Sequence, residues 1–216
     1  MGEADSIVFV VDDDPSFRRS TERLIRLAGF NVQAFGSARE FFAAKRPDGP
    51  SCLVLDVRMP GLSGLDLQQE LAKAGIAIPI IFVTGHGDIP MSVQAMKAGA
   101  VEFFTKPFNG QKFLSAIDEA LKRDRVARQE QARLAEVRAY YCSLTRRERE
   151  VMAHVVSGML NKQIAAKLHT VEKTIKFHRA HIMDKMQAGS VAELVRMAGD
   201  LGVSPPRASH TGLRSR

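Results

Sequence analysis

The chain has 216 residues, enough for one large or two small domains. Hydrophobic residues make up 45% and charged residues 25%, a composition that argues against wholesale disorder. No apolar run approaches the ~18–20 residues of a membrane span, and the N-terminus has no basic segment before its apolar run, so neither a membrane partner nor a signal peptide is expected. Cys52 and Cys142 match no disulfide or zinc spacing, which predicts a reduced, cytoplasmic protein.

The net charge of +7 is unevenly divided along the chain. Residues 1–121 carry 12 Lys and Arg against 15 Asp and Glu, a balance of −3. Residues 122–216 carry 19 against 9, a balance of +10. This asymmetry predicts two domains, the second of which faces a polyanion such as a nucleic acid. A solubilising run of charge is the alternative interpretation.

Short apolar runs alternate with amphipathic segments through the first half of the chain. The runs are predicted strands at 7–11, 32–35, 53–55, 78–83 and 101–105. Helices are expected at 15–28, 37–46, 65–74 and 89–98, and a last one begins near Gly110. The alternation predicts an α/β fold with a five-stranded, doubly wound parallel sheet covered on both faces. Ligands of such sheets bind beyond the carboxyl ends of the strands.

The second half is predicted to contain helices only. Residues 112–139 contain neither Gly nor Pro and predict a long linker helix, in which Ala120, Ala127, Leu134 and Tyr141 recur every seven residues. A solvated linker and a weakly paired coiled coil both fit this pattern. An all-α domain of four helices follows, the first within the segment RREREVMAHVVSG at 146–158 and the others at 161–168, 172–186 and 190–200, and the tail 204–216 is expected to be disordered. Thr145 and Glu148 have the spacing of a capping box.

Polar side chains collect at the predicted strand ends: Asp12, Asp13, Asp56, Thr84 and Lys106. Clustered carboxylates repel one another and favour a counter-charge, for which Mg²⁺ with its oxygen ligands is suited. A metal there would align a phosphoryl donor with Asp56 as nucleophile, while Lys106 and the Thr84 hydroxyl hold the phosphoryl oxygens. Asp14, before Pro15, is expected to cap a helix or to be a bystander.

The motifs VVDDDP, LDVRMPGLSG, VTGH and KPF resemble the receiver domain of two-component response regulators, a flavodoxin-like fold, over residues 6–121. The resemblance implies that a sensor histidine kinase phosphorylates Asp56. It implies that Asp12, Asp13, Asp56 and the backbone carbonyl of Arg58 hold Mg²⁺. It also implies switch roles for Thr84, Lys106 and Phe103, and a cis peptide bond at Lys106–Pro107.

The motifs LTRREREVM, GMLNKQIA and EKTIKFHRAHIMDKM resemble the LuxR-type helix-turn-helix domain of the FixJ/NarL family. The implied domains are a receiver at 1–121, a helical linker at 122–142 and the DNA-binding domain at 143–203. By this match, residues facing base edges are Lys176, Phe177, Arg179 and Ala180. Residues touching the DNA backbone are Asn161, Lys162, Lys173, Thr174, His178 and Lys185.

Two positions depart from the family pattern. Val171 stands where the family usually has Ser or Thr before the recognition helix, so Thr170 is expected to cap that helix instead. Ala180 stands where some members present a Lys, so the base preference cannot be copied from any one member. His178 and His181 are three residues apart on the helix, but the other ligands of a metal site are missing.

These expectations combine into one leading hypothesis: a transcription factor that is phosphorylated on Asp56 with Mg²⁺, forms a homodimer and binds double-stranded promoter DNA. Val93 and Lys97 are the candidate dimer residues, with ordinary helix surface as their alternative role. The chain is expected not to be an enzyme beyond slow self-dephosphorylation. Alternatives are a phosphorylation-independent DNA-binding regulator, a phosphohydrolase that uses Asp56, and an RNA-binding protein, which the absence of Trp and the presence of only two Tyr disfavour.

Overall fold

The computed structural model describes residues 6–85 and 89–203, so the predicted tail 204–216 lies outside the described residues. The contacts divide the chain into two units, which meet in sequence between Gln129 and Glu130. We call them unit 1 and unit 2 and describe each by itself. Among the described residues, no helix is both long and apolar enough to cross a membrane.

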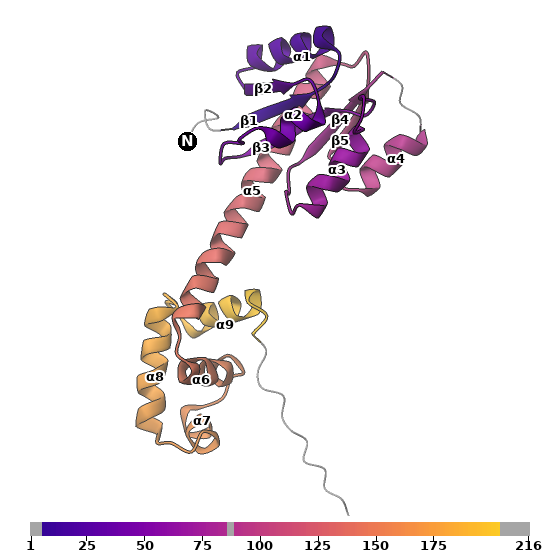
Figure 1. The fold of residues 1–216 in the computed structure, drawn as a ribbon. Coiled ribbons are helices and arrows are strands. Elements are labelled where there is room, and N and C mark those ends of the chain that lie inside the picture. The colour runs from indigo at the N-terminus through magenta and orange to yellow at the C-terminus, as the bar shows by residue number, and fades with distance from the viewer. Residues whose placement is uncertain (1–5, 86–88, 204–216) are drawn as a thin grey trace, which may run out of the picture. The chain divides into compact units, whose positions relative to one another are not determined.

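Unit 1 contains a five-stranded parallel sheet in the order β2-β1-β3-β4-β5 (Figure 1). The strands are β1 (Ile7–Val11), β2 (Asn31–Phe35), β3 (Ser51–Asp56), β4 (Ile80–Thr84) and β5 (Glu102–Thr105). The helices are α1 (Pro15–Leu27), α2 (Ala38–Ala43), α3 (Gly64–Lys73), α4 (Ile89–Lys97) and the first part of α5 (Gly110–Ser143). The predicted doubly wound sheet is confirmed.

Two apolar clusters lie on opposite faces of this sheet, because successive side chains of a strand point to opposite sides. Phe9, Leu53 and Phe82 pack with α2, α3 and α4 on one face. On the other face, Val10 and Val54 pack with α1 and α5. Strands buried on both faces explain why the apolar runs in the sequence are continuous rather than alternating.

Two predicted elements were too long. The fourth strand begins at Ile80 rather than at residue 78, because Pro79 has no N–H to donate to the ladder and contributes only its carbonyl, to the Leu53 amide. The second helix ends at Ala43 rather than at residue 46, because Ala44 has an extended backbone with ψ of 138°.

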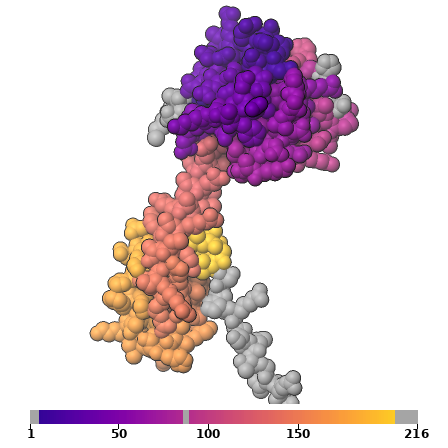
Figure 2. Space-filling model, viewed as in Figure 1, coloured from indigo at the N-terminus to yellow at the C-terminus, as the bar shows by residue number. Residues whose placement is uncertain are grey.

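The predicted linker helix is part of α5, which runs unbroken for 34 residues. Asp124 fixes α5 to the start of β3, since its carboxylate accepts from the Ser51 amide at 2.8 Å and from Arg128 Nε at 2.7 Å. Of the heptad residues, Ala120 is fully buried in unit 1 and Tyr141 packs on the core of unit 2. Only Ala127 and Leu134 remain for pairing with another helix, which favours the solvated linker. Most residues of α5 between 122 and 136 are exposed, and Figure 2 shows atoms of this segment at the surface.

Unit 2 consists of the end of α5 and of α6 (Arg146–Val156), α7 (Asn161–Lys167), α8 (Glu172–Lys185) and α9 (Val191–Asp200). Its core joins apolar residues of every helix, among them Val137, Val151, Ile164, Ile175, Ile182 and Leu194. The capping box of Thr145 and Glu148 at the start of α6 is confirmed.

The expectation that Thr170 caps the recognition helix is wrong. Val171 is the N-cap residue of α8, and no side chain caps this helix end. Thr170 instead belongs to the turn that ends α7, where its amide donates to the Ala165 carbonyl at 3.0 Å. The recognition helix α8 therefore begins at Glu172.

Gly64, the first residue of α3, generates a prediction. A Cβ at this position would lie 2.2 Å from the Asp56 carbonyl oxygen, which is backbone and cannot turn aside. Gly64→Ala is therefore expected to lower the free energy of unfolding of unit 1 by at least about 2 kcal/mol. Gly110→Ala is the matched control, since its Cβ would meet only Leu24 side-chain atoms at 3.7 Å or more. Denaturant titration compares the two; equal stability of both variants would contradict the prediction.

Candidate functional site

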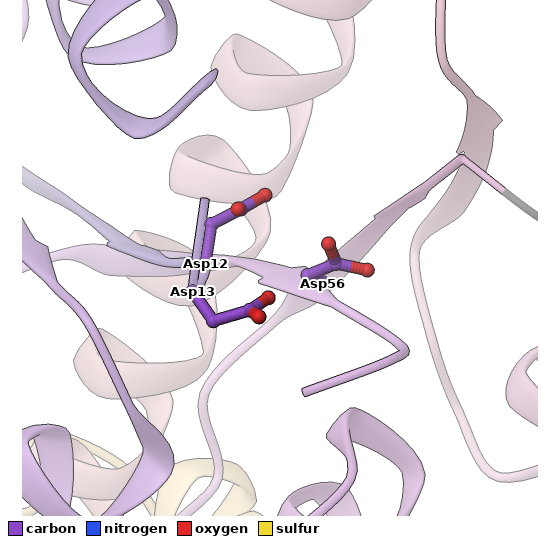
Figure 3. A group of neighbouring side chains, drawn as sticks. All are labelled: Asp12, Asp13 and Asp56. Carbon is purple, nitrogen blue, oxygen red and sulfur yellow. The ribbon is translucent and has the colours of Figure 1, made fainter. Parts of the chain in front are cut away.

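Three carboxylates converge at the carboxyl ends of β1 and β3. Asp12 and Asp13 follow β1, and Asp56 is the last residue of β3. Each offers one oxygen, and these three oxygens lie within 4.8 Å of one another (Figure 3). Asp12 and Asp56 are buried, whereas Asp13 is exposed. The sequence placed these residues together because parallel strands end at one edge, and the geometry is that of a possible metal site.

Lys106, just beyond β5, supplies the positive charge of this cluster. Its ammonium group lies 2.6 Å from Asp12 Oδ2 and 2.9 Å from Asp56 Oδ2. The Lys106 amide donates to the carbonyl of Thr84 at 2.8 Å, which ties its position to the end of β4. The predicted cis peptide bond at Lys106–Pro107 is present. This one ammonium contacts two of the three carboxylates, so negative charge remains in excess.

Burial and charge shift the ionisation of this cluster. Burial raises the pKa of Asp12, and the neighbouring Asp56 carboxylate raises it further, while Lys106 opposes both. Burial by itself would lower the pKa of Lys106, but its hydrogen bonds to Asp12 and Asp56 outweigh burial, and its pKa is raised. Lys106 is therefore held as a cation, and further positive charge at the cluster would stabilise the ionised form of Asp12.

Two supporting residues escaped the sequence reasoning. The Phe17 ring lies under the Lys106 ammonium, 3.7 Å from ring centroid to Nζ. Arg18 donates to the Asp12 backbone carbonyl at 2.6 Å. Both lie in the first turn of α1, which Asp14 caps by accepting from the amides of Ser16 and Phe17. The only signal in the sequence was their place directly after the acidic run.

The expected switch residues Thr84 and Phe103 lie on β4 and β5. Thr84 ends β4 and is 1% exposed. Phe103 on β5 is half-buried and packs against Phe82, with ring centroids 6.3 Å apart. The Arg58 amide donates to Asp56 Oδ1 at 3.1 Å, so this residue lies next to the cluster, while the metal-binding role of its carbonyl stays a prediction. The candidate dimer residues Val93 and Lys97 are exposed on α4.

The predicted DNA-contact residues lie on α7 and α8. They differ in their exposure and in whether their side chains have partners within unit 2. Lys173, Lys176, Phe177 and Ala180 are exposed, while Thr174 and His178 are half-buried. Arg179 donates to Asn161 Oδ1 at 3.2 Å. Lys185 lies 2.7 Å from Glu148, whose side chain is 4% exposed. Lys162 follows Asn161 in the first turn of α7 and is exposed.

Glu148 joins the start of α6 to the end of α8. Burial would raise the pKa of its carboxyl, but the hydrogen bonds from Lys185 and from the Thr145 amide outweigh burial and lower the pKa to about 2. Glu148 therefore stays ionised, and its salt bridge to Lys185 fixes the end of α8 to the start of α6. Sequence reasoning recognised Glu148 as a capping residue and missed its pairing with Lys185, which is 37 residues away.

A pH-dependent loss of stability is expected for Glu148→Gln. At pH 7 the variant loses hydrogen bonds to a charged group, worth about 2 kcal/mol of the free energy of unfolding of unit 2. A carboxyl with a lowered pKa stabilises the fold above its unfolded pKa, so the gap to the wild type shrinks as the pH falls from about 4.5 towards about 2. NMR signals of the Ile175 and Ile182 methyl groups report thermal unfolding of unit 2 within the full chain.

The control for this prediction is Glu172→Gln, because Glu172 is exposed and lies 3.4 Å from Lys176. This variant is expected to unfold like the wild type within about 0.5 kcal/mol. A Glu148→Gln gap that stays constant from pH 7 to pH 3 would contradict the role of the charge.

Comparison with known proteins bears on both units. A family model described as the response regulator receiver domain matches residues 8–118. A second model, described as bacterial regulatory proteins of the luxR family, matches residues 142–198. The two resemblances expected from the sequence motifs are thus confirmed.

Similar proteins share this architecture along most of their length. Nodulation protein W of Bradyrhizobium diazoefficiens is 54% identical over 206 residues, covering 95% of this chain and 89% of its own. The transcriptional regulatory protein FixJ of the same species is 40% identical over 196 residues, covering 91% and 96%. The solved structure of the response regulator StyR has a TM-score of 0.83 at 46% identity, covering 90% of this chain and 98% of that one. The chain therefore belongs to the response regulators that join a receiver domain to a LuxR-type DNA-binding domain.

Proposed function

We propose that this response regulator accepts a phosphoryl group on Asp56, with Mg²⁺ bound at the acidic cluster, and that phosphorylation promotes homodimerisation and sequence-specific binding of promoter DNA. The observation that carries the proposal is the convergence of Asp12, Asp13 and Asp56, two of which are paired with Lys106. A buried carboxylate beside an ammonium and an acidic pair combines a nucleophile, a cation and metal ligands in one place.

The cluster suits a divalent cation for reasons of charge and ligand type. Carboxylate oxygens are hard ligands, and Mg²⁺ in proteins is usually held by one or two carboxylates together with water and phosphate oxygens. Asp13 is exposed and open to such an ion, while Asp12 and Asp56 supply the buried side of the site. When bound, the ion neutralises charge on the incoming phosphoryl group. The Arg58 backbone carbonyl is the proposed further ligand.

Phosphorylation changes the charge that the surrounding residues meet. Asp56 Oδ attacks the phosphorus of a phosphohistidine on the sensor kinase, the P–N bond breaks, and the kinase histidine is released. The aspartyl phosphate adds acceptor oxygens and negative charge at this site. Lys106, already hydrogen-bonded to Asp56, pairs with these oxygens, and the Thr84 hydroxyl donates to them. Phe103 then fills the space that Thr84 leaves, which alters the surface of α4 near Val93 and Lys97.

Dimerisation connects this change to DNA. Two receivers held together give two recognition helices a high local concentration at paired half-sites. Candidate DNA residues remain those named above on α7 and α8. A cytoplasmic location, where promoter DNA is accessible, is part of this proposal. In this proposal Asp56 keeps the phosphoryl group that it accepts. A phosphohydrolase would instead release phosphate and turn over repeatedly.

Asp56→Asn tests the acceptor. The full chain is incubated with acetyl phosphate and Mg²⁺, and its mass, sedimentation and DNA footprint are measured. The wild type is expected to gain one phosphoryl group, sediment as a dimer and protect a paired site, whereas Asp56→Asn does none of these. Asp14→Asn is the matched control, because it removes a neighbouring carboxylate while Asn still caps α1. It is expected to behave as the wild type.

Other outcomes identify the alternatives. Equal DNA footprints for the wild type and Asp56→Asn, with and without the donor, would favour a phosphorylation-independent regulator. Multiple turnovers of a phosphomonoester that disappear in Asp56→Asn would favour a phosphohydrolase. Preference for structured RNA over duplex DNA in competition would favour an RNA-binding output.

Asp13→Asn tests the metal. Removing one carboxylate from the cluster is expected to weaken Mg²⁺ binding at least about tenfold, measured by isothermal titration calorimetry, and to slow phosphorylation by acetyl phosphate at fixed Mg²⁺. High Mg²⁺ restores the rate if the defect lies in metal binding. Unchanged Mg²⁺ affinity would exclude Asp13 as a ligand. Asp14→Asn again serves as the control.

A further inference from the structure

The outward face of α8 is formed by Lys173, Lys176, Phe177 and Ala180, all exposed. These positions are three or four residues apart and therefore neighbours on one side of the helix. Phe177 is 59% exposed, whereas Ile175 and Ile182 on the opposite side are fully buried. The exposed phenyl ring of Phe177 thus has two lysines N-terminal to it and Ala180 C-terminal to it on this helix.

The other two Lys and Arg residues of α8 are already paired within unit 2. Arg179 is bonded to Asn161, and Lys185 is bonded to the buried Glu148. Lys176 lies 3.4 Å from Glu172. Within the described residues, Lys173 has no such partner. Beside Lys176, the exposed groups in the middle of α8 are Phe177 and Ala180, which are apolar.

The Phe177 ring is held from one side by His181. Their ring centroids are 4.1 Å apart at an interplanar angle of 52°. His181 Nδ1 in turn lies 3.9 Å from Glu148 Oε1, beside the buried carboxylate that holds Lys185. Phe177 is thus an exposed side chain whose orientation is supported by a second ring, which lowers the entropy that a contact at this point would cost.

We propose that Phe177 and Ala180 read thymine through its 5-methyl group in the major groove, and that His181 is the positioning residue for the Phe177 ring. In the major groove the methyl group distinguishes thymine, and phenyl and Ala side chains contact it without hydrogen bonds. The lysines provide the charge complementarity to DNA phosphates, which position the helix but carry no base information. This inference rests on the proposed DNA-binding function and adds the base class.

The test uses two versions of one duplex. A duplex is first selected from a random pool by the full chain treated with beryllofluoride, and is then remade with deoxyuridine in place of every thymine in the footprint. Fluorescence anisotropy gives the dissociation constant for each. Wild type is expected to bind the thymine duplex at least about fourfold more tightly, the factor that corresponds to burying one methylene-sized group. Phe177→Ala is expected to lose most of this preference, and Ala180 to keep the remainder.

Two further variants separate base reading from general affinity. Lys173→Ala is expected to weaken binding to both duplexes by the same factor and to reduce the salt slope by about one, while keeping the thymine preference. His181→Ala is expected to lose part of the preference and His181→Phe to restore it, a rescue that a purely structural loss would not give. Phe177 is exposed, so its replacement leaves the core of unit 2 in place.

The outcomes are distinguishable. Equal wild-type affinity for both duplexes overturns thymine reading while leaving DNA binding intact. A thymine preference that is undiminished in Phe177→Ala overturns the assignment of the reading to Phe177. A selection that enriches no duplex overturns the proposed function together with the inference that rests on it.

Discussion

The imbalance of charge around Lys106 is the constraint on which the rest of unit 1 depends. Asp12 and Asp56 are buried at the ends of neighbouring strands, where like charges destabilise each other, and a single ammonium lies within 2.9 Å of both. The fold tolerates this arrangement because Lys106 remains charged and because Arg18 and Phe17 support the Asp12 backbone and the ammonium from α1. Folding alone does not remove the remaining negative charge at this strand edge.

Unit 2 resolves a similar conflict in a different way. Glu148 is almost completely buried, yet it is satisfied by Lys185 and by the Thr145 amide. Here one ammonium is paired with one carboxylate, so no net charge remains, and the salt bridge connects two helices. A buried pair of this kind does little for overall stability compared with apolar packing, but losing one partner is costly because the other charge remains in the interior. The orientation of α8 is thereby linked to the start of α6.

The sequence was sufficient for the order of elements and for the acidic cluster, and insufficient for the pairings that depend on three-dimensional proximity. Parallel strands force their carboxyl ends to one edge, so Asp12 and Asp56 could be placed together from the apolar runs alone. The start of β4 was misjudged because the apolar pattern continues through Pro79, which cannot donate to the ladder. The bond from Arg179 to Asn161 joins residues 18 apart across a turn, and no local periodicity reports it.

The loop between β3 and α3 has a consequence for how the acidic cluster responds to ligands. The Gly64 amide donates to the Val57 carbonyl at 2.9 Å, and the Asp56 carbonyl lies where only a residue without a side chain fits. Residues 57–64 thus form a closed ring of backbone, whose closure entropy is lost once, during folding. Arg58 is one of the residues of this ring. A ligand that engaged the Arg58 carbonyl would therefore meet an oxygen whose position folding has already set, and it would not have to order a free loop.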